Sequence, residues 1–146
     1  MKDDGWTQVP FDRRTFVRRV GGAAGGALLS VHLAACRDLA DQAREAAAAG
    51  SGFSTLTADE GRQLEAVCAT LIPSGDTPGA REAGAAHFID LVLGTFEAGN
   101  LPTIREGLSG LKRRVESAEG SGTSFADLSA ARQVEILADV EREDPV

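Results

Sequence analysis

Residues 56–73, LTADEGRQLEAVCATLIP, contain the start, the apolar face and the end of one predicted helix. Thr57 is a favourable N-cap residue, and Glu60, three positions later, completes a capping box. Pro73 ends the helix because proline has no backbone N–H and its ring clashes with the preceding turn. The apolar positions recur at helical spacing and comprise Leu64, Val67, Cys68, Leu71 and Ile72. This stretch therefore predicts an amphipathic helix that buries one face.

A second helix is predicted beyond the turn-rich loop PSGDTPG at residues 73–79. Thr77 followed by Pro78 has the order of a capping residue and a proline in the first helical turn. We therefore expect a helix from Pro78 to about Phe96. Its apolar or small positions are Ala80, Ala83, Gly84, His87, Phe88, Leu91, Val92 and Phe96. The small residues near its start would let another backbone approach closely.

Two further helices follow, and no segment alternates as a strand would. Ile104, Leu108, Leu111 and Val115 mark the third helix, and Val134, Leu137 and Val140 lie on one face of the fourth, which Ser129 caps. The sequence thus predicts an all-α fold, a small bundle of about four helices at residues 53–146. Residues 36–52, which end in Gly-Ser-Gly, are expected to form a spacer that includes a short helix.

The first 35 residues have the features of a cleavable export signal. Arg13, Arg14 and Phe16 belong to a run, RRTFVR, that resembles the twin-arginine motif. Val20 to Ala35 is sixteen residues without a charge, shorter than the roughly 20 apolar residues that span a membrane. We therefore expect residues 1–35 to direct export through the twin-arginine translocase, which carries folded proteins that hold a cofactor or travel bound to one that does.

The end of this run, LAAC at residues 33–36, resembles a lipobox. Cleavage before Cys36 would leave a lipidated cysteine and a membrane anchor, whereas ordinary signal peptidase would leave an unlipidated chain. Either way the protein is expected to be periplasmic or anchored to a membrane facing the periplasm. With Cys36 lipidated, Cys68 would be unpaired within the chain, and it would be either a buried, inert thiol or one half of an intermolecular disulfide.

The net charge of the chain after the signal argues against several classes of partner. Removing residues 1–35 leaves 111 residues with ten basic and nineteen acidic side chains, a net charge of −9. Such a surface disfavours nucleic acid and direct adsorption to anionic lipid. We therefore expect contact with a membrane only through a lipid anchor or a partner.

The remaining chain has no recognisable catalytic, metal or cofactor motif. His87 is its single histidine after the signal, and no Cys/His cluster, CxxCH or phosphate-binding glycine loop is present outside the signal. A lone histidine on a face of small residues is more often packed than catalytic. The sequence thus predicts a non-catalytic protein with no metal and no cofactor of its own, and an enzyme centred on His87 is the minor alternative.

The first two predicted helices resemble the gluconate 2-dehydrogenase subunit 3 family, whose pattern is L-T-x-x-E, then I-P, D-x-P-G-A-x-x-A-G and F-I-D. The matching residues are Leu56, Thr57, Glu60, Leu64, Ile72, Pro73, Asp76, Pro78, Gly79, Ala80, Ala83, Gly84, Phe88, Ile89 and Asp90. Phe125–Ser129 and residues 134–137 resemble the family's downstream helix. The resemblance spans about residues 53–142. Family members usually continue further, so we expect a short or truncated member.

The resemblance implies a role in a complex. Members are non-catalytic small subunits of membrane-associated flavin dehydrogenases of sugars or sugar acids. The large, GMC-type subunit holds FAD, and a cytochrome c subunit often accepts the electrons. The small subunit stabilises the large one and accompanies it through the twin-arginine pathway. A free-standing envelope lipoprotein with a structural or binding role is the alternative.

The expected partner contact is the loop and helix from Ile72 to Phe88. Its candidate residues are Ile72, Pro73, Asp76, Pro78, Gly79, Ala80, Ala83, Gly84 and Phe88. An exposed turn on a rigid helix pair suits recognition. The competing interpretation is that these small residues only pack one helix against another within the domain.

Overall fold

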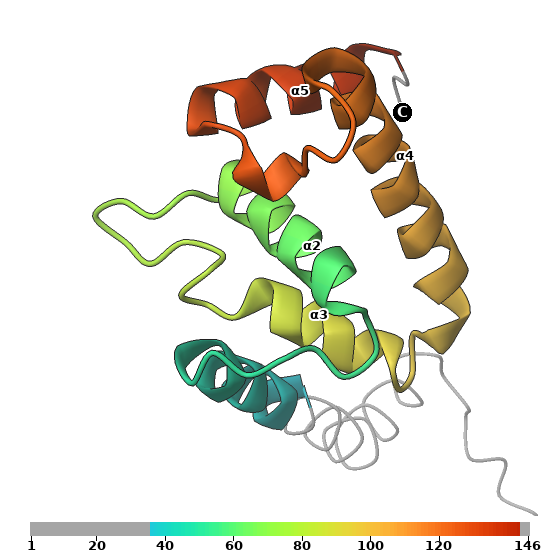
Figure 1. The fold of residues 1–146 in the computed structure, drawn as a ribbon. Coiled ribbons are helices and arrows are strands. Elements are labelled where there is room, and N and C mark those ends of the chain that lie inside the picture. Colours follow the sequence, from blue (N-terminus) through green and yellow to red (C-terminus); the bar gives the residue numbers. More distant parts are fainter. Residues whose placement is uncertain (1–35, 144–146) are drawn as a thin grey trace, which may run out of the picture. The chain divides into compact units, whose positions relative to one another are not determined.

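The computed structural model describes residues 36–143, and within that range the chain forms helices and no strand (Figure 1). The elements are a helix over residues 36–48, α2 (Ala58–Leu71), α3 (Ala85–Leu93), a 3-10 turn η1 (Ala98–Asn100), α4 (Leu101–Glu119), a 3-10 turn η2 (Phe125–Asp127) and α5 (Ala130–Glu143). The all-α prediction is confirmed for these residues. Four of the five α-helices lie in the range of the expected bundle of about four, and the fifth, over residues 36–48, lies in the segment where a spacer with a short helix was expected. Arg13, Arg14 and Phe16 lie outside the described residues.

Helix α2 organises the fold, since it contacts α3, α4, α5 and η2 (Figure 1). Its start is the predicted capping box: the Glu60 N–H donates to Thr57 Oγ1 (3.3 Å), and the Thr57 N–H donates to Glu60 Oε2 (2.8 Å). Its last turn closes with the Ile72 N–H donating to the Cys68 carbonyl, directly before Pro73. The prediction for this helix is confirmed at both ends.

Replacing Thr57 with alanine should lower the free energy of unfolding by about 1 kcal/mol, because it removes one of the two reciprocal capping bonds. The melting temperature measured by circular dichroism checks this. Thr103→Ala, an exposed residue in the first turn of α4, is the control and should change stability by less than about 0.5 kcal/mol. Equal melting temperatures for the two variants would contradict the assigned role of the cap.

Helix α3 begins seven residues later than predicted, at Ala85 rather than Pro78. Residues 79–83 make one turn, in which the Ala83 N–H donates to the Gly79 carbonyl. A Schellman motif then ends that turn: the Ala85 N–H donates to the Ala80 carbonyl, the Gly84 N–H donates to the Arg81 carbonyl, and Gly84 has φ +70°. The prediction of one continuous helix was wrong because Gly84 breaks it in the left-handed conformation.

The segment expected to be a spacer contributes to the packing of the domain. Its helix over residues 36–48 contains Ala43, which is fully buried. A Cβ added at Gly84 would lie 2.6 Å from the Ala43 carbonyl oxygen, so the two backbones are in direct contact. This helix ends in a Schellman motif of its own, with Gly50 at φ +63°.

Two apolar clusters form the core. The first comprises Leu56, Leu64, Ala86, Leu93 and Leu108, and the second comprises Ala66, Val115, Phe125 and Ile136. Helix α2 supplies residues to both clusters and so joins them. Its predicted apolar face does not remain buried to the end, because Leu71 is 68% and Ile72 62% exposed. Phe96, predicted to lie on a helix face, is also exposed, beyond the end of α3.

Candidate functional site

The candidate partner-binding segment, residues 72–88, divides into an exposed and an inward-facing set. The exposed residues are Ile72, Pro73, Asp76, Pro78 and Ala83, whereas Gly79, Ala80 and Gly84 are buried and Phe88 is half-buried. A Cβ at Gly79 would lie 2.6 Å from the Ser74 backbone nitrogen. The buried small residues therefore serve close packing inside the domain, and only the exposed set is available to another protein.

Hydrogen bonds within this segment fix the shape of its loop. The Glu82 carboxylate accepts from Ser74 Oγ (2.6 and 2.7 Å to its two oxygens) and from the Gly79 N–H (3.0 Å). The Ala80 N–H donates to the Ile72 carbonyl across the base of the loop (2.9 Å). The bond from Ser74 lowers the pKa of Glu82, with a smaller contribution from the Gly79 N–H. These bonds hold the loop that places Ile72 and Pro73 at the surface in one conformation.

Asp90 is the most completely buried carboxylate among the described residues, and it holds the segment that precedes α2. One oxygen accepts from the Thr55 and Leu56 N–H groups (2.9 and 2.7 Å), and the other from the N–H and hydroxyl of Ser54 (both 2.7 Å). Burial raises the pKa of Asp90, but these four bonds more than offset it, so the pKa lies below its ordinary value. Asp90 therefore links α3 to the segment before α2, and each of its carboxylate oxygens accepts two hydrogen bonds.

His87 is likewise a packed residue. It is 7% exposed, its Nε2 lies 3.0 Å from the Ser51 carbonyl oxygen, and its ring stacks on Phe53 with centroids 4.6 Å apart. A Cβ at Gly61 would lie 2.0 Å from the Phe53 ring, so Phe53 fills the space between α2 and α3. His87 is therefore a packed residue in this structure, between the Ser51 carbonyl and the Phe53 ring.

Asp90 and the three residues that donate to it, Ser54, Thr55 and Leu56, are called the latch below. The sequence alone does not predict this contact, because it shows Asp90 only as part of the F-I-D pattern. The signal that could have revealed it is a single acidic residue inside the otherwise apolar run HFIDLVL at residues 87–93. A buried carboxylate needs donors, and here they come from a segment 34 to 36 positions earlier in the chain.

Neither cysteine forms a disulfide in the structure: Cys36 is exposed and Cys68 is half-buried against the first core cluster. Burial raises the pKa of the Cys68 thiol, which makes its thiolate scarce at neutral pH. Within residues 36–143, no group of three His, Cys, Asp or Glu side chains is placed to hold a metal ion. In the same range, no helix has the length and apolar character needed to cross a bilayer.

The comparisons with known proteins return one relationship. The family model described as gluconate 2-dehydrogenase subunit 3 matches residues 58–146, from the first residue of α2 to the last residue of the chain. No curated protein and no solved structure matches the chain. The matched range contains the capping-box glutamate, the 72–84 loop with its Schellman glycine, and Asp90. The chain therefore belongs to the gluconate 2-dehydrogenase subunit 3 family.

Proposed function

We propose that this chain is the non-catalytic small subunit of a membrane-associated dehydrogenase of sugars or sugar acids. It would bind and stabilise a large GMC-type subunit that holds FAD, and a cytochrome c subunit would accept the electrons. It would also carry the large subunit, already folded around FAD, through the twin-arginine translocase. The complex would then work in the periplasm, held at the membrane by a lipid on Cys36 or by a partner.

The observation that carries this proposal is the family match over residues 58–146. The chemistry of the domain supports it. Asp90, His87 and Glu82 are each engaged in bonds that hold backbone segments together. These three titratable groups serve to hold the fold, which suits a subunit that binds rather than catalyses.

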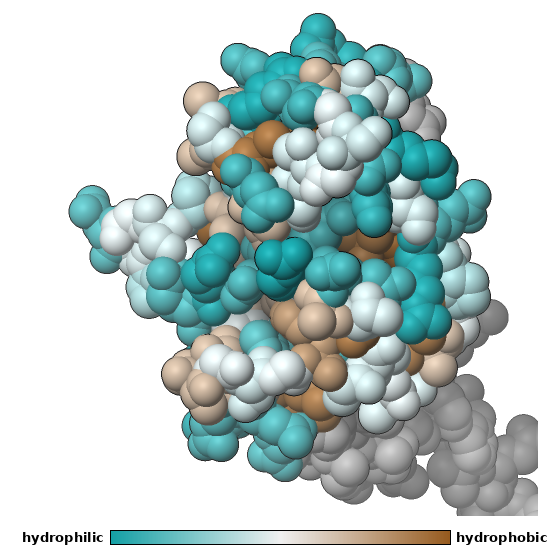
Figure 2. Space-filling model, viewed as in Figure 1, coloured by the Kyte–Doolittle hydropathy of each residue, from teal (hydrophilic) through white to brown (hydrophobic). Residues whose placement is uncertain are grey.

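The proposed contact surface is the exposed part of the 72–88 segment. Leu71 and Ile72 are largely exposed apolar side chains beside Pro73, and the bonds of Glu82 hold the loop that follows them. A fixed loop loses little conformational entropy on binding. In Figure 2 most of the visible surface is hydrophilic or neutral. Exposed apolar residues on a fixed loop therefore stand out as a place for another subunit to bind.

Gentle purification of the C-terminally tagged chain from membranes tests the proposal. We expect a flavoprotein dehydrogenase subunit in near-equal amount, identified by mass spectrometry and by its flavin absorbance spectrum. Deleting residues 1–35 should leave that subunit in the cytoplasm. A colourless chain with no stoichiometric partner would contradict the proposal and favour the free-standing lipoprotein.

A surface variant tests where the partner binds. Ile72→Asp places a charge at a position that is 62% exposed, so it should spare the fold while reducing the recovered flavoprotein about tenfold. Phe96→Asp, at 63% exposure outside the segment, is the matched control and should recover the wild-type amount. Equal recovery with both variants would remove the 72–88 segment as the contact while leaving the subunit role in place.

A further inference from the structure

An apolar groove, open to the surface, lies between helices α2, α4 and α5, and no part of residues 36–143 fills it. Its volume is about 490 Å³. The lining consists of Leu64 and Val67 from α2, Thr103, Ile104, Gly107, Leu108, Gly110, Leu111 and Arg114 from α4, and Leu137 and Val140 from α5. In Figure 2 hydrophobic surface is visible between hydrophilic side chains in the region between α2 and α4.

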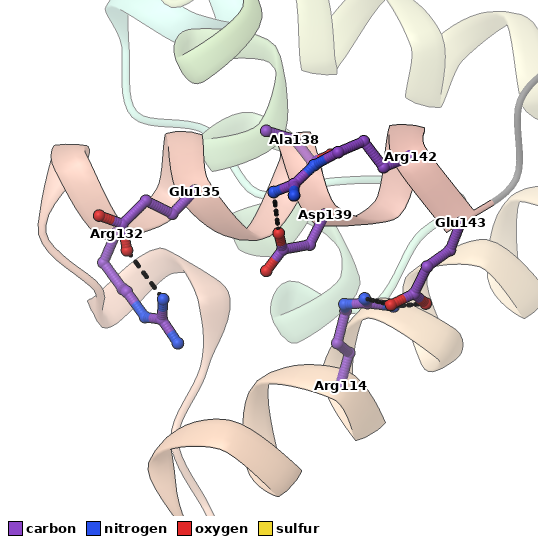
Figure 3. A network of polar contacts seen from close by, with 7 residues as sticks. All are labelled: Arg114, Arg132, Glu135, Ala138, Asp139, Arg142 and Glu143. Atoms are coloured by element: carbon purple, nitrogen blue, oxygen red, sulfur yellow. Dashed lines mark hydrogen bonds and ion pairs between the residues drawn. The ribbon is translucent and has the colours of Figure 1, made fainter.

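Polar contacts between the three helices fix their relative positions. Buried Gln63 donates from Nε2 to the Leu108 carbonyl (2.7 Å) and ties α2 to α4. Thr70 Oγ1 lies 3.1 Å from Gln133 Oε1 and ties α2 to α5. Arg114 of α4 makes two bonds to the Glu143 carboxylate of α5 (2.7 and 2.5 Å), whereas the other pairs in Figure 3 lie within α5.

The single charge in the groove lining is already neutralised. Arg114 is the only charged lining residue, and its guanidinium is engaged by Glu143. Small-molecule sites usually add a few convergent polar groups to an apolar wall so that the ligand is oriented. Because Thr103 is the only other polar side chain in this lining, the groove favours apolar side chains over a polar metabolite.

Two glycines on the groove face of α4 have no packing role among residues 36–143. Within that range, a Cβ at Gly107 would meet nothing within 4 Å, and one at Gly110 would meet only the flexible tip of Arg113 at 3.8 Å. Glycine in a helix interior is destabilising, and here no neighbouring element of the described part of the chain needs the space. Their placement on the lining suits close approach by a backbone that belongs to another molecule.

We infer that this groove binds an apolar helix of the flavin-containing dehydrogenase subunit, an inference that rests on the proposed function. The family is one of subunits of a complex, so we expect another subunit to cover part of the surface of this domain. The lining of α4 runs from Thr103 to Arg114, about 16 Å at 1.5 Å per residue, the length of a three-turn helix. Such a helix lays its apolar face into a groove through anchors three or four residues apart.

Filling the groove from within tests the inference in the full-length tagged chain purified with its flavoprotein. Gly107→Leu adds a side chain where the structure has space, and leucine has the higher helix propensity. We expect about tenfold less flavoprotein per tagged chain, with a melting temperature no lower than that of the wild type. Ser109→Leu, exposed on the same helix and outside the lining, is the matched control and should recover the wild-type amount. Gly110→Leu is a second groove variant with the same expectation.

A photo-crosslinking amino acid at Thr103 identifies the occupant. A crosslink to an amphipathic segment of the flavoprotein supports the inference. A crosslink to a second copy of this chain, or to lipid alone, overturns it, as does wild-type recovery of the flavoprotein by both glycine variants. In these cases the subunit role still stands. If the unmodified chain recovers no flavoprotein, the proposed function fails, and this inference fails with it.

Discussion

Asp90→Ala is expected to lower the free energy of unfolding by about 4 kcal/mol. Asp90 is 3% exposed and accepts four hydrogen bonds. Alanine would leave the three N–H groups of Ser54, Thr55 and Leu56 without this acceptor, and each buried donor left unsatisfied typically costs about 1 to 3 kcal/mol. For a domain of this size, the melting temperature should fall by about 20 °C.

Two milder variants separate the contribution of the Asp90 charge from the contribution of a single hydrogen bond. Asp90→Asn keeps one oxygen but points N–H groups toward donors, so it should fall between the wild type and Asp90→Ala. Ser54→Ala removes one hydroxyl bond and should cost about 1 kcal/mol. Asp59→Ala, exposed at the start of α2, is the control, with a cost of about 1 kcal/mol or less. A loss below about 1 kcal/mol for Asp90→Ala in urea unfolding would refute the latch.

The pH dependence of stability follows from the same contacts. The folded pKa of Asp90 lies below its ordinary value, so the unfolded chain takes up this proton at higher pH than the folded chain does. The stabilisation is therefore fully present above the ordinary value of about 3.9 and is lost as the pH falls through the folded pKa. Asp90→Asn should remove this part of the acid sensitivity, which unfolding curves from pH 2 to pH 6 would measure.

Local signals predicted much of this fold, and distant contacts account for what they missed. The capping box of Thr57 and Glu60, the stop at Pro73 and the periodicity of α4 each depend on residues a few positions apart, and the structure confirms them. The continuous helix from Pro78 failed because the Schellman turn at Gly84 is reinforced by contact with Ala43, 41 residues earlier.

The same reasoning applies to the candidate site. The sequence shows that the 72–88 segment is rich in small residues and turn residues. It does not indicate which of these residues face inward, since that depends on how the loop folds over the backbone of residues 72–74. The groove between α2, α4 and α5 depends on how three helices are spaced by Gln63, Thr70 and Arg114. Helical periodicity marks each apolar face without indicating which faces meet, so a gap between them has no local signature.

Gly84→Ala is expected to lower the free energy of unfolding by about 3 kcal/mol. An alanine at φ +70° costs about 1 to 2 kcal/mol in the left-handed conformation. Its Cβ would also lie 2.6 Å from the Ala43 carbonyl oxygen, a backbone atom that cannot rotate away, and such overpacking adds about 1 to 3 kcal/mol. Urea unfolding of the domain measures the sum.

Gly50→Ala is the matched control that divides this cost into its two parts. Gly50 ends the helix over residues 36–48 in the same Schellman geometry, at φ +63°, but a Cβ there would meet nothing within 4 Å. Gly50→Ala should therefore show only the conformational cost, about 1 kcal/mol. Equal losses in the two variants would mean that contact with Ala43 contributes nothing. A larger loss at Gly84 would explain physically why a glycine stands at the end of the Ala-x-x-Ala-Gly motif: two helices meet there with no room for a side chain.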